Sequence, residues 1–285
     1  MRPTTIALLV LLASTLARAD GSIEINQACV PAGCFAGDSP GFPVEIVEPG
    51  SYRLSSNLQV PTGLDGIVGS ATGISLDLAG FEVSGPVSCT ADIDAITDLL
   101  IDVVCTGSPG TATGIADVTT IENGTVRGFR DGIRIGGDSV ALVRNVHVRE
   151  NSGDGIDANH RTMRIVDSTV STNGNNGVTG TGDTARLLIT GSIARENGDI
   201  GIYMANGVLR DSLIILNGTE GGVRANVFPD GPGSLIADTQ FVRNQVAIVA
   251  RPETAIRDSL FIENGDDIVN GATSISGNLC DGVSC

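Results

Sequence analysis

A short segment built around an Asn-Gly step recurs along the second half of the chain. It first reads Glu-Asn-Ser-Gly-Asp-Gly-Ile and last reads Glu-Asn-Gly-Asp-Asp-Ile. Alignment on its asparagine gives Asn151, Asn173, Asn197, Asn217, Asn244 and Asn264, at intervals of 22, 24, 20, 27 and 20 residues. A repeat of this length is typical of a solenoid, in which each unit buries its apolar face only against its neighbours.

Other columns keep a constant distance from these asparagines. Two columns are apolar, and they comprise Val143, Ile165, Ile189, Leu209, Ile236 and Ile256, and then Val148, Val170, Ala194, Ile214, Phe241 and Phe261. Between them lie turn-forming residues, Asn145, Asp167, Gly191, Asp211, Asp238 and Asp258, each followed by a mostly small polar one, Val146, Ser168, Ser192, Ser212, Thr239 and Ser259. Apolar and outward positions alternate with period two, which predicts short strands that stack in parallel at ~4.8 Å.

The spacing also divides the chain into parts. We predict an N-terminal cap with the first strands at 20–73, the array at 74–270 and a C-terminal cap at 271–285. Two stretches interrupt the period, and we expect loop insertions there, at 86–114 and 227–233.

These coils of about 22 residues, with their asparagine ladder and serine stack, resemble the right-handed parallel β-helix (pectate-lyase-like) superfamily. The resemblance implies an all-β, single-stranded, right-handed solenoid of about 7–8 coils with capped ends. It also implies that the inward asparagines are structural, because each amide can donate to one neighbouring coil and accept from the other. It does not specify an activity, since the superfamily includes lyases, hydrolases, esterases, epimerases and non-catalytic surface proteins.

The N-terminus and the cysteines predict export. Residues 1–19 read as a secretory signal peptide, with Arg2, an apolar run too short to span a bilayer, and Ala17-Arg18-Ala19. Six cysteines in an exported chain favour disulfides, and among fifteen connectivities we favour the local pairs that staple the two caps and the first insertion. These pairs are Cys29–Cys34, Cys89–Cys105 and Cys280–Cys285. The predicted location is secreted or periplasmic.

Composition excludes several partners. The formal net charge is −16, which argues against nucleic acid and anionic membranes as partners. No second apolar stretch is long enough to insert into a membrane. All 17 basic residues are Arg, so Schiff-base chemistry on Lys is excluded, and the absence of Lys hints at a bacterial source. The sequence leaves the oligomeric state open.

The residue after each Gly-Ile step gives the candidate binding face. This column contains Arg134, Asp157, Thr179, Tyr203 and Arg224, and two residues further lie Asn159, Thr181 and Asn226. Alternation points these side chains outward on one face roughly 19 Å long. Such a row suits a polysaccharide, because Arg binds carboxylates, amides bind hydroxyls and Tyr stacks on a pyranose. The alternative is a solvated face with cross-strand pairing of Arg134 and Asp157.

A catalytic alternative centres on the same face. A polyuronate lyase or C5-epimerase could use His160 as base, Tyr203 as acid and Arg134 or Arg161 as carboxylate partner, beside Asp157. The stretch Asp157-Ala-Asn-His160 partly resembles the Asp-Pro-His-Asp motif of alginate C5-epimerases, but the Pro is missing and the His lies one place late. Asp131 and Asp154 could hold Ca²⁺, although two carboxylates are fewer ligands than Ca²⁺ prefers. No other cofactor is expected.

We therefore read the chain as an exported β-helix that binds an extracellular or cell-envelope polysaccharide on an outward sheet face. The enzyme just described and a non-catalytic spacer protein are the two alternatives.

Overall fold

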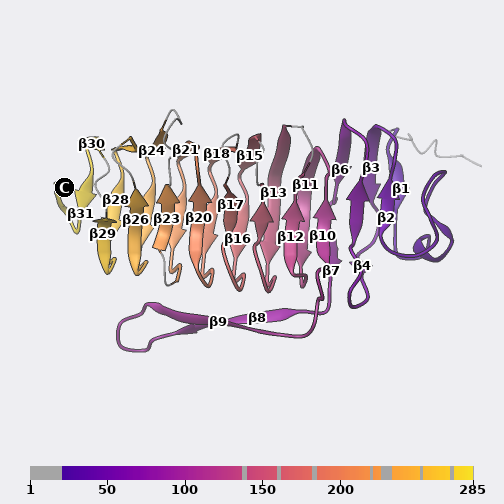
Figure 1. Ribbon diagram of the computed structural model, residues 1–285, viewed down its shortest axis with the longest axis horizontal. Coiled ribbons are helices and arrows are strands. Elements are labelled where there is room, and N and C mark those ends of the chain that lie inside the picture. Colours follow the sequence, from indigo (N-terminus) through magenta and orange to yellow (C-terminus); the bar gives the residue numbers. More distant parts are fainter. Residues whose placement is uncertain are drawn as a thin grey trace, which may run out of the picture.

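The structure is a computed structural model that describes residues 21–136, 140–158, 162–181, 185–218, 221–225, 233–250, 253–269 and 273–284. The chain winds into an elongated parallel β-solenoid, which runs from β1 (Ile23–Ile25) to β31 (Leu279–Cys280) (Figure 1). The predicted all-β class is confirmed, with one short 3-10 turn, η1 (Val30–Ala32), among the described residues. The solenoid has about nine turns rather than 7–8, because strands within 21–73 already pair in register with the array.

Each coil contributes one strand to each of three parallel sheets. The first sheet contains β1, β3 (Gly50–Leu54), β6 (Ile74–Asp77), the starts of β11 (Thr120–Arg127) and β13 (Ala141–Arg149), β15 (Thr162–Val166), β18 (Arg186–Thr190), β21 (Gly207–Arg210), β24 (Ser234–Ala237), β27 (Ala255–Arg257) and β30 (Thr273–Ser276). The second contains β4 (Leu58–Gln59), β7 (Glu82–Ser84), the ends of β11 and β13, β16 (Thr169–Ser171), β19 (Ile193–Arg195), β22 (Leu213–Ile215), β25 (Gln240–Val242), β28 (Leu260–Ile262) and β31. The third contains β2 (Val44–Ile46), β5 (Ile67–Gly69), β10 (Thr113–Ala116), β12 (Asp131–Arg134), β14 (Ile156–Asp157), β17 (Val178–Gly180), β20 (Ile200–Met204), β23 (Gly221–Ala225), β26 (Val246–Ala250) and β29 (Asp266–Val269).

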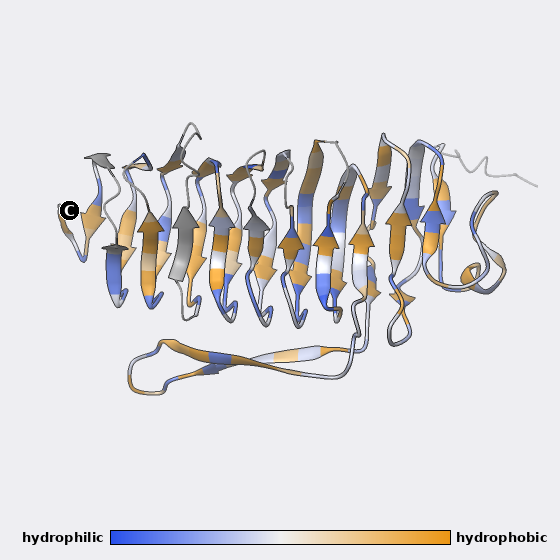
Figure 2. Ribbon diagram, viewed as in Figure 1, coloured by the Kyte–Doolittle hydropathy of each residue, from blue (hydrophilic) through white to orange (hydrophobic). Residues whose placement is uncertain are grey.

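The two apolar columns form the core, as predicted. Ile165 pairs with Ile189 in the first sheet, and Val170 pairs with Ala194 in the second. Every member of both columns is at most 2% exposed, and the rings of Phe241 and Phe261 stack with centroids 5.0 Å apart. Apolar and polar residues alternate along the strands (Figure 2). Strand alternation therefore divides each coil into a fixed interior and a variable exterior.

The asparagine ladder lies inside the turn between the second and third sheets. Each buried amide nitrogen donates to the side-chain oxygen of the next asparagine, for example Asn173 Nδ2 to Asn197 Oδ1 at 2.9 Å. The same oxygens accept backbone N–H groups, as Asn197 Oδ1 does from Asn173. The residue before each asparagine has a positive φ, and this tight turn leaves backbone groups that only an inward side chain can satisfy. The structural interpretation of the asparagines is confirmed.

A second ladder occupies the turn between the first and second sheets. Ser192 Oγ accepts the backbone N–H of Ser168 at 3.3 Å and donates to the carbonyl of Thr190. The turn-forming column before it is left-handed, with φ of 49° at Asp167 and 50° at Asp211. The glycine that precedes Ile156 in the third sheet also has a reason: a Cβ at Gly155 would lie 2.7 Å from the Gly177 carbonyl oxygen of the next coil.

Two predicted disulfides are present, Cys29–Cys34 and Cys89–Cys105. Cys280 is also disulfide-bonded, while its predicted partner Cys285 lies outside the described residues. The predicted signal peptide at 1–19 lies outside them as well, and so does the predicted insertion at 227–233 except for Gly233.

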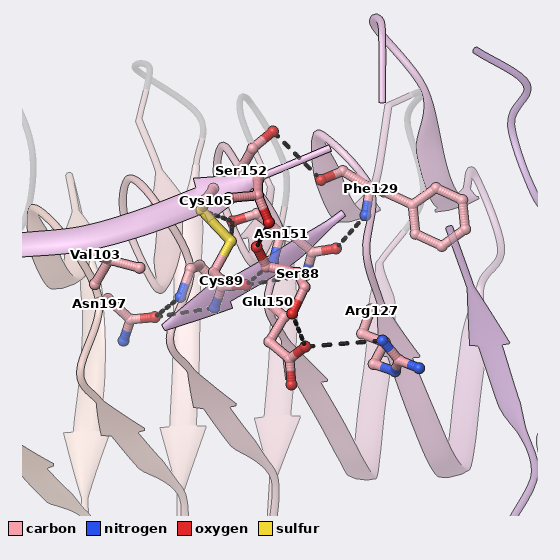
Figure 3. Close-up of a disulfide and its surroundings, with 12 residues drawn as sticks. Ser88, Cys89, Val103, Cys105, Arg127, Phe129, Glu150, Asn151, Ser152 and Asn197 are labelled. Carbon is pink, nitrogen blue, oxygen red and sulfur yellow. Dashed lines mark hydrogen bonds and ion pairs between the residues drawn. A yellow bond between two sulfur atoms is a disulfide. The ribbon is translucent and has the colours of Figure 1, made fainter. Parts of the chain in front are cut away.

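The insertion predicted as a loop at 86–114 is largely an antiparallel hairpin. Strands β8 (Ser88–Ile93) and β9 (Leu100–Thr106) pair around the disulfide, and β10 already begins at Thr113. The hairpin runs along the turns that hold the asparagine ladder, parallel to the solenoid axis (Figure 1). Cys89 lies over the Asn151 carbonyl (Figure 3), and Gln245 Nε2 donates to the Leu100 carbonyl at 3.1 Å. The segment pairs because its buried residues, among them Cys89 and Leu100, form a small separate core.

Ile189→Asp should unfold the array, because it places a carboxylate without a partner at a 1% exposed position, at a cost of several kcal/mol. The control is Thr190→Asp, which puts the same charge on the exposed neighbouring residue and should leave the melting temperature nearly unchanged. Thermal unfolding followed by circular dichroism measures both. Similar melting temperatures for the two variants would contradict the inward assignment of Ile189.

Candidate functional site

The predicted outward row lies in register on the third sheet. Arg134 pairs with Asp157, Asp157 with Thr179, Thr179 with Tyr203 and Tyr203 with Arg224. The row continues into Val249 and Val269 at one end and into Ala116 and Val68 at the other, so its uninterrupted polar run covers five strands. The sequence pattern therefore placed these residues on one line.

The side chains of this row differ in what they offer a ligand. Arg134 is exposed, while Asp157, Thr181 and Tyr203 are half-buried. Thr179 is only 6% exposed, and its hydroxyl donates to Asp154 Oδ2 at 2.8 Å. This row is therefore partly committed to contacts within the sheet.

Several predicted site residues cannot be placed on this face. Asn159, His160, Arg161 and Asn226 lie outside the described residues, as does the side chain of Arg224. The proposed base of the enzyme hypothesis is thus among them.

Asp131 and Asp154, the predicted Ca²⁺ pair, belong to a third ladder at the entry to the third sheet. Asp131 Oδ1 accepts the Asp154 backbone N–H at 3.3 Å, and Asp154 Oδ1 accepts the Asn176 N–H at 3.1 Å. Asn176 Oδ1 continues the pattern with the N–H of Ile200. Asp154 also accepts the Asn175 amide at 2.6 Å. Within the described ranges, no group of three or more His, Cys, Asp or Glu side chains could hold a metal ion.

A hollow that sequence analysis missed lies on the first sheet. It measures about 360 Å³ and is lined by Arg164, Val166, Leu188, Thr190, Val208 and Arg210. A second hollow, of about 400 Å³, shares Val208 and adds Arg186 and Leu235. Together they form what we call the arginine groove, a strip of half-buried aliphatic side chains with guanidinium groups along it.

The arginines of this groove are not neutralised by any carboxylate that the structure describes. In the part of the chain that the structure describes, no carboxylate forms an ion pair with Arg164, Arg186 or Arg210, and Glu253, which also lines the second hollow, does not reach Arg186. The Nε atom of Arg210 is buried and has no hydrogen-bond acceptor. Elsewhere on the surface, arginines pair with acids, as Arg127 does with Glu82 at 3.0 Å. The groove therefore keeps unused donors for an anion.

The register explains the groove and shows how it could have been found. Arg164, Leu188, Val208 and Leu235 occupy one outward column, and Val166, Thr190 and Arg210 occupy the next. The same counting that located the row of the third sheet applies here, because the two columns lie one residue before and one residue after the Ile165 column. The signal was missed because aliphatic residues interrupt the arginines.

A family model for the right-handed β-helix region matches residues 113–280, which is more than half of the chain. The chain belongs to the right-handed β-helix family.

Solved structures of other β-helix proteins are similar in fold. The Dettilon tailspike protein has a TM-score of 0.54 at 11% identity, over 76% of this chain and 46% of that chain. Pectate lyase Pel9A has a TM-score of 0.47 at 11% identity, over 88% of this chain and 73% of that one. This chain thus spans less than half the length of the tailspike chain, and at this identity the likeness concerns the fold alone. A comparison with curated protein sequences finds no match.

Asp131→Asn should raise the melting temperature of this β-helix protein at pH 7. Burial raises the pKa of Asp131, so the folded state favours the protonated carboxyl. The resulting stabilisation is complete below the unfolded pKa of 3.8 and is lost as the pH rises through the higher folded pKa. An amide keeps the acceptor for Asp154, as Asn176 shows, without the buried charge.

Melting curves from pH 3 to pH 8, with and without Ca²⁺, test this. The difference between variant and wild type should shrink as the pH falls below 3.8. A lower melting temperature for the variant at pH 7 would contradict the ladder role, and Ca²⁺ stabilisation seen only in the wild type would make Asp131 a metal ligand.

Proposed function

We propose that this protein is an exported, non-catalytic β-helix that binds an acidic polysaccharide in the arginine groove of its first sheet. The observation that carries the proposal is a set of three arginines, Arg164, Arg186 and Arg210, which lie around an aliphatic strip and form no ion pair with any described carboxylate. The disulfides and the signal-like residues 1–19 support export, and we place the protein outside the cell or in the periplasm.

The chemistry of the groove matches a sugar acid. A guanidinium donates two parallel hydrogen bonds to a carboxylate or sulfate, and these charged hydrogen bonds are about twice as strong as neutral ones. The apolar face of a pyranose ring can lie on Leu188, Val208 and Leu235, which are half-buried and offer aliphatic surface. The groove thus offers aliphatic surface for the sugar rings and guanidinium groups for their charged substituents.

The groove also fits an extended chain. Its columns follow the solenoid axis and cross successive strands at ~4.8 Å, so a chain along the axis passes over one strand after another, with an arginine on each of β15, β18 and β21. Arg257 continues the Arg210 column on β27, and its Nε is likewise buried without an acceptor. A polymer lying along the axis would therefore meet guanidinium groups from β15 to β27.

The local positive charge of the groove explains how a protein of acidic composition could bind an acidic polysaccharide. The net charge of −16 repels a polyanion at long range, but at physiological salt the Debye length is ~8 Å, so nearby groups dominate. Binding should weaken as salt increases. The row on the third sheet, with Arg134 and Tyr203, remains a second candidate surface for the same ligand, since it supplies a cation and an aromatic ring.

Arg164→Gln combined with Arg210→Gln should weaken binding to acidic polysaccharides by ~10-fold or more, since charged hydrogen bonds contribute ~1.5–3 kcal/mol each. The melting temperature should hardly change, because both side chains point outward. Isothermal titration calorimetry with alginate, polygalacturonate and a glycosaminoglycan measures the effect, and dextran serves as the uncharged control ligand.

The matched control is Asp157→Ala combined with Tyr203→Ala on the third sheet. Loss of binding only in this control would show that the ligand binds to the predicted row of the third sheet instead of the groove. Equal binding by wild type and both double variants, or no binding of any acidic polysaccharide by the wild type, refutes the proposal and leaves the spacer interpretation.

A further inference from the structure

The hairpin of β8 and β9 carries an unusual outward face. Ile101 and Val104 are each 50% exposed, and Ile96 at the tip is 94% exposed. Residues 86–114 also contain four aspartates and no basic residue, namely Asp92, Asp94, Asp98 and Asp102. Aliphatic side chains exposed beside a single sign of charge are typical of an interaction surface rather than a merely solvated strand.

The charge on this face is unfavourable in the isolated molecule. Asp92 and Asp102 lie directly opposite each other in the antiparallel pair, and both are exposed. Like charges in such a pair destabilise a sheet. Asp94 adds to the charge, since the backbone N–H groups of Thr97 and Ile96 lower the pKa of its carboxyl. A cationic partner would relieve this repulsion.

The hairpin presents the face on a firm support. At its base, the Cys89–Cys105 disulfide lies over the Asn151 carbonyl (Figure 3). Near its tip, Gln245 bonds the Leu100 carbonyl, and Arg243 lies 3.6 Å from Asp98. Because both ends of the hairpin are held in place, the hairpin loses little conformational entropy when a partner binds to it.

The matching surface is on the same chain but on the other side of the molecule. The hairpin covers the corner between the second and third sheets, whereas the arginine groove lies on the first sheet (Figure 1). Both run parallel to the solenoid axis. The hairpin offers paired carboxylates flanked by Ile101 and Val104, and the groove offers guanidinium groups flanked by aliphatic side chains.

We infer that the outward face of the β8–β9 hairpin docks into the arginine groove of a second copy of this chain. Asp92 and Asp102 of one molecule meet Arg164 and Arg210 of the next, and Ile101 and Val104 pack on Leu188 and Val208. The inference goes beyond polysaccharide binding and does not depend on it. The groove would then be shared by two anionic partners, a glycan and a neighbouring molecule.

The geometry determines the kind of assembly. Two different surfaces on opposite sides make a heterologous contact, which extends into open rows rather than closing a dimer. The contact is small, and the molecules repel each other through their net charge, so the association is weak and depends on salt. It extends side by side, with the solenoid axes parallel.

The test uses two neutral variants of the full-length protein with its disulfides intact. The hairpin variant carries Asp92→Asn and Asp102→Asn, and the groove variant carries Arg164→Gln and Arg210→Gln. Sedimentation velocity over a range of concentrations should show growing oligomers for the wild type and ~10-fold or weaker association for each variant alone. An equimolar mixture of the two should stop at a 1:1 dimer, because one hairpin and one groove remain intact.

The control variant, Glu24→Gln with Glu48→Gln, makes the same charge change as the hairpin variant at exposed positions near the N-terminal end. It should associate as the wild type does. A wild type that stays monomeric at all concentrations, a hairpin variant that still associates like the wild type, or a mixture that forms no dimer would each overturn the inference. Glycan binding by the hairpin variant should be at least as tight as that of the wild type, since its groove is intact and no hairpin competes for it, so failure here is distinguishable from failure of the proposed function.

Discussion

Side-chain hydrogen bonds that pass from coil to coil make the rest of this structure possible. Each coil turns sharply, with positive φ before every ladder asparagine, and so leaves backbone N–H groups facing a dry interior. The next coil supplies the acceptor, as Asn197 does for Asn173 and Ser192 does for Ser168. An unsatisfied buried donor costs ~1–3 kcal/mol, so a solenoid without these ladders would lose its turns coil by coil.

This constraint determines where function can reside. Inward positions are committed to ladders and aliphatic columns, and the third ladder recruits even the carboxylates of Asp131 and Asp154. Outward positions are not constrained by ladder hydrogen bonds or by core packing, so neighbouring sheets can differ in charge and shape while sharing one core. The arginine groove of the first sheet and the partly self-bonded row of the third sheet are two outcomes of that freedom.

The sequence predicted the repeating part of the structure far better than the exceptions to it. Columns such as Ile165–Ile189 and the row from Arg134 to Arg224 could be placed because a period-two strand inside a regular repeat leaves one register. The predicted number of coils omitted the turns within 21–73, since the spacing of residues there departs from the Asn-Gly repeat. The hairpin was predicted only as a stapled loop, because its pairing depends on contacts with distant turns such as Gln245. The groove depends on which arginines lack acids nearby, which is a property of three-dimensional neighbours.

The acidic composition and the exclusive use of Arg fit one physical account. A net charge of −16 keeps elongated, largely β molecules apart through repulsion, which opposes edge-to-edge aggregation of the sheets. Against that background, any cation left without a carboxylate creates a local site for anions, and Arg does so with a planar fork of donors that Lys lacks. Six arginines of the described surface form ion pairs with acids, as Arg127 does with Glu82 and Arg243 with Glu263. Arg164, Arg186 and Arg210 of the arginine groove form no ion pair with a described carboxylate, and residues 86–114, which include the hairpin on the opposite side, contain no basic residue. This separation of charge across the molecule makes both a polyanionic ligand and a neighbouring copy chemically suitable partners for the same groove.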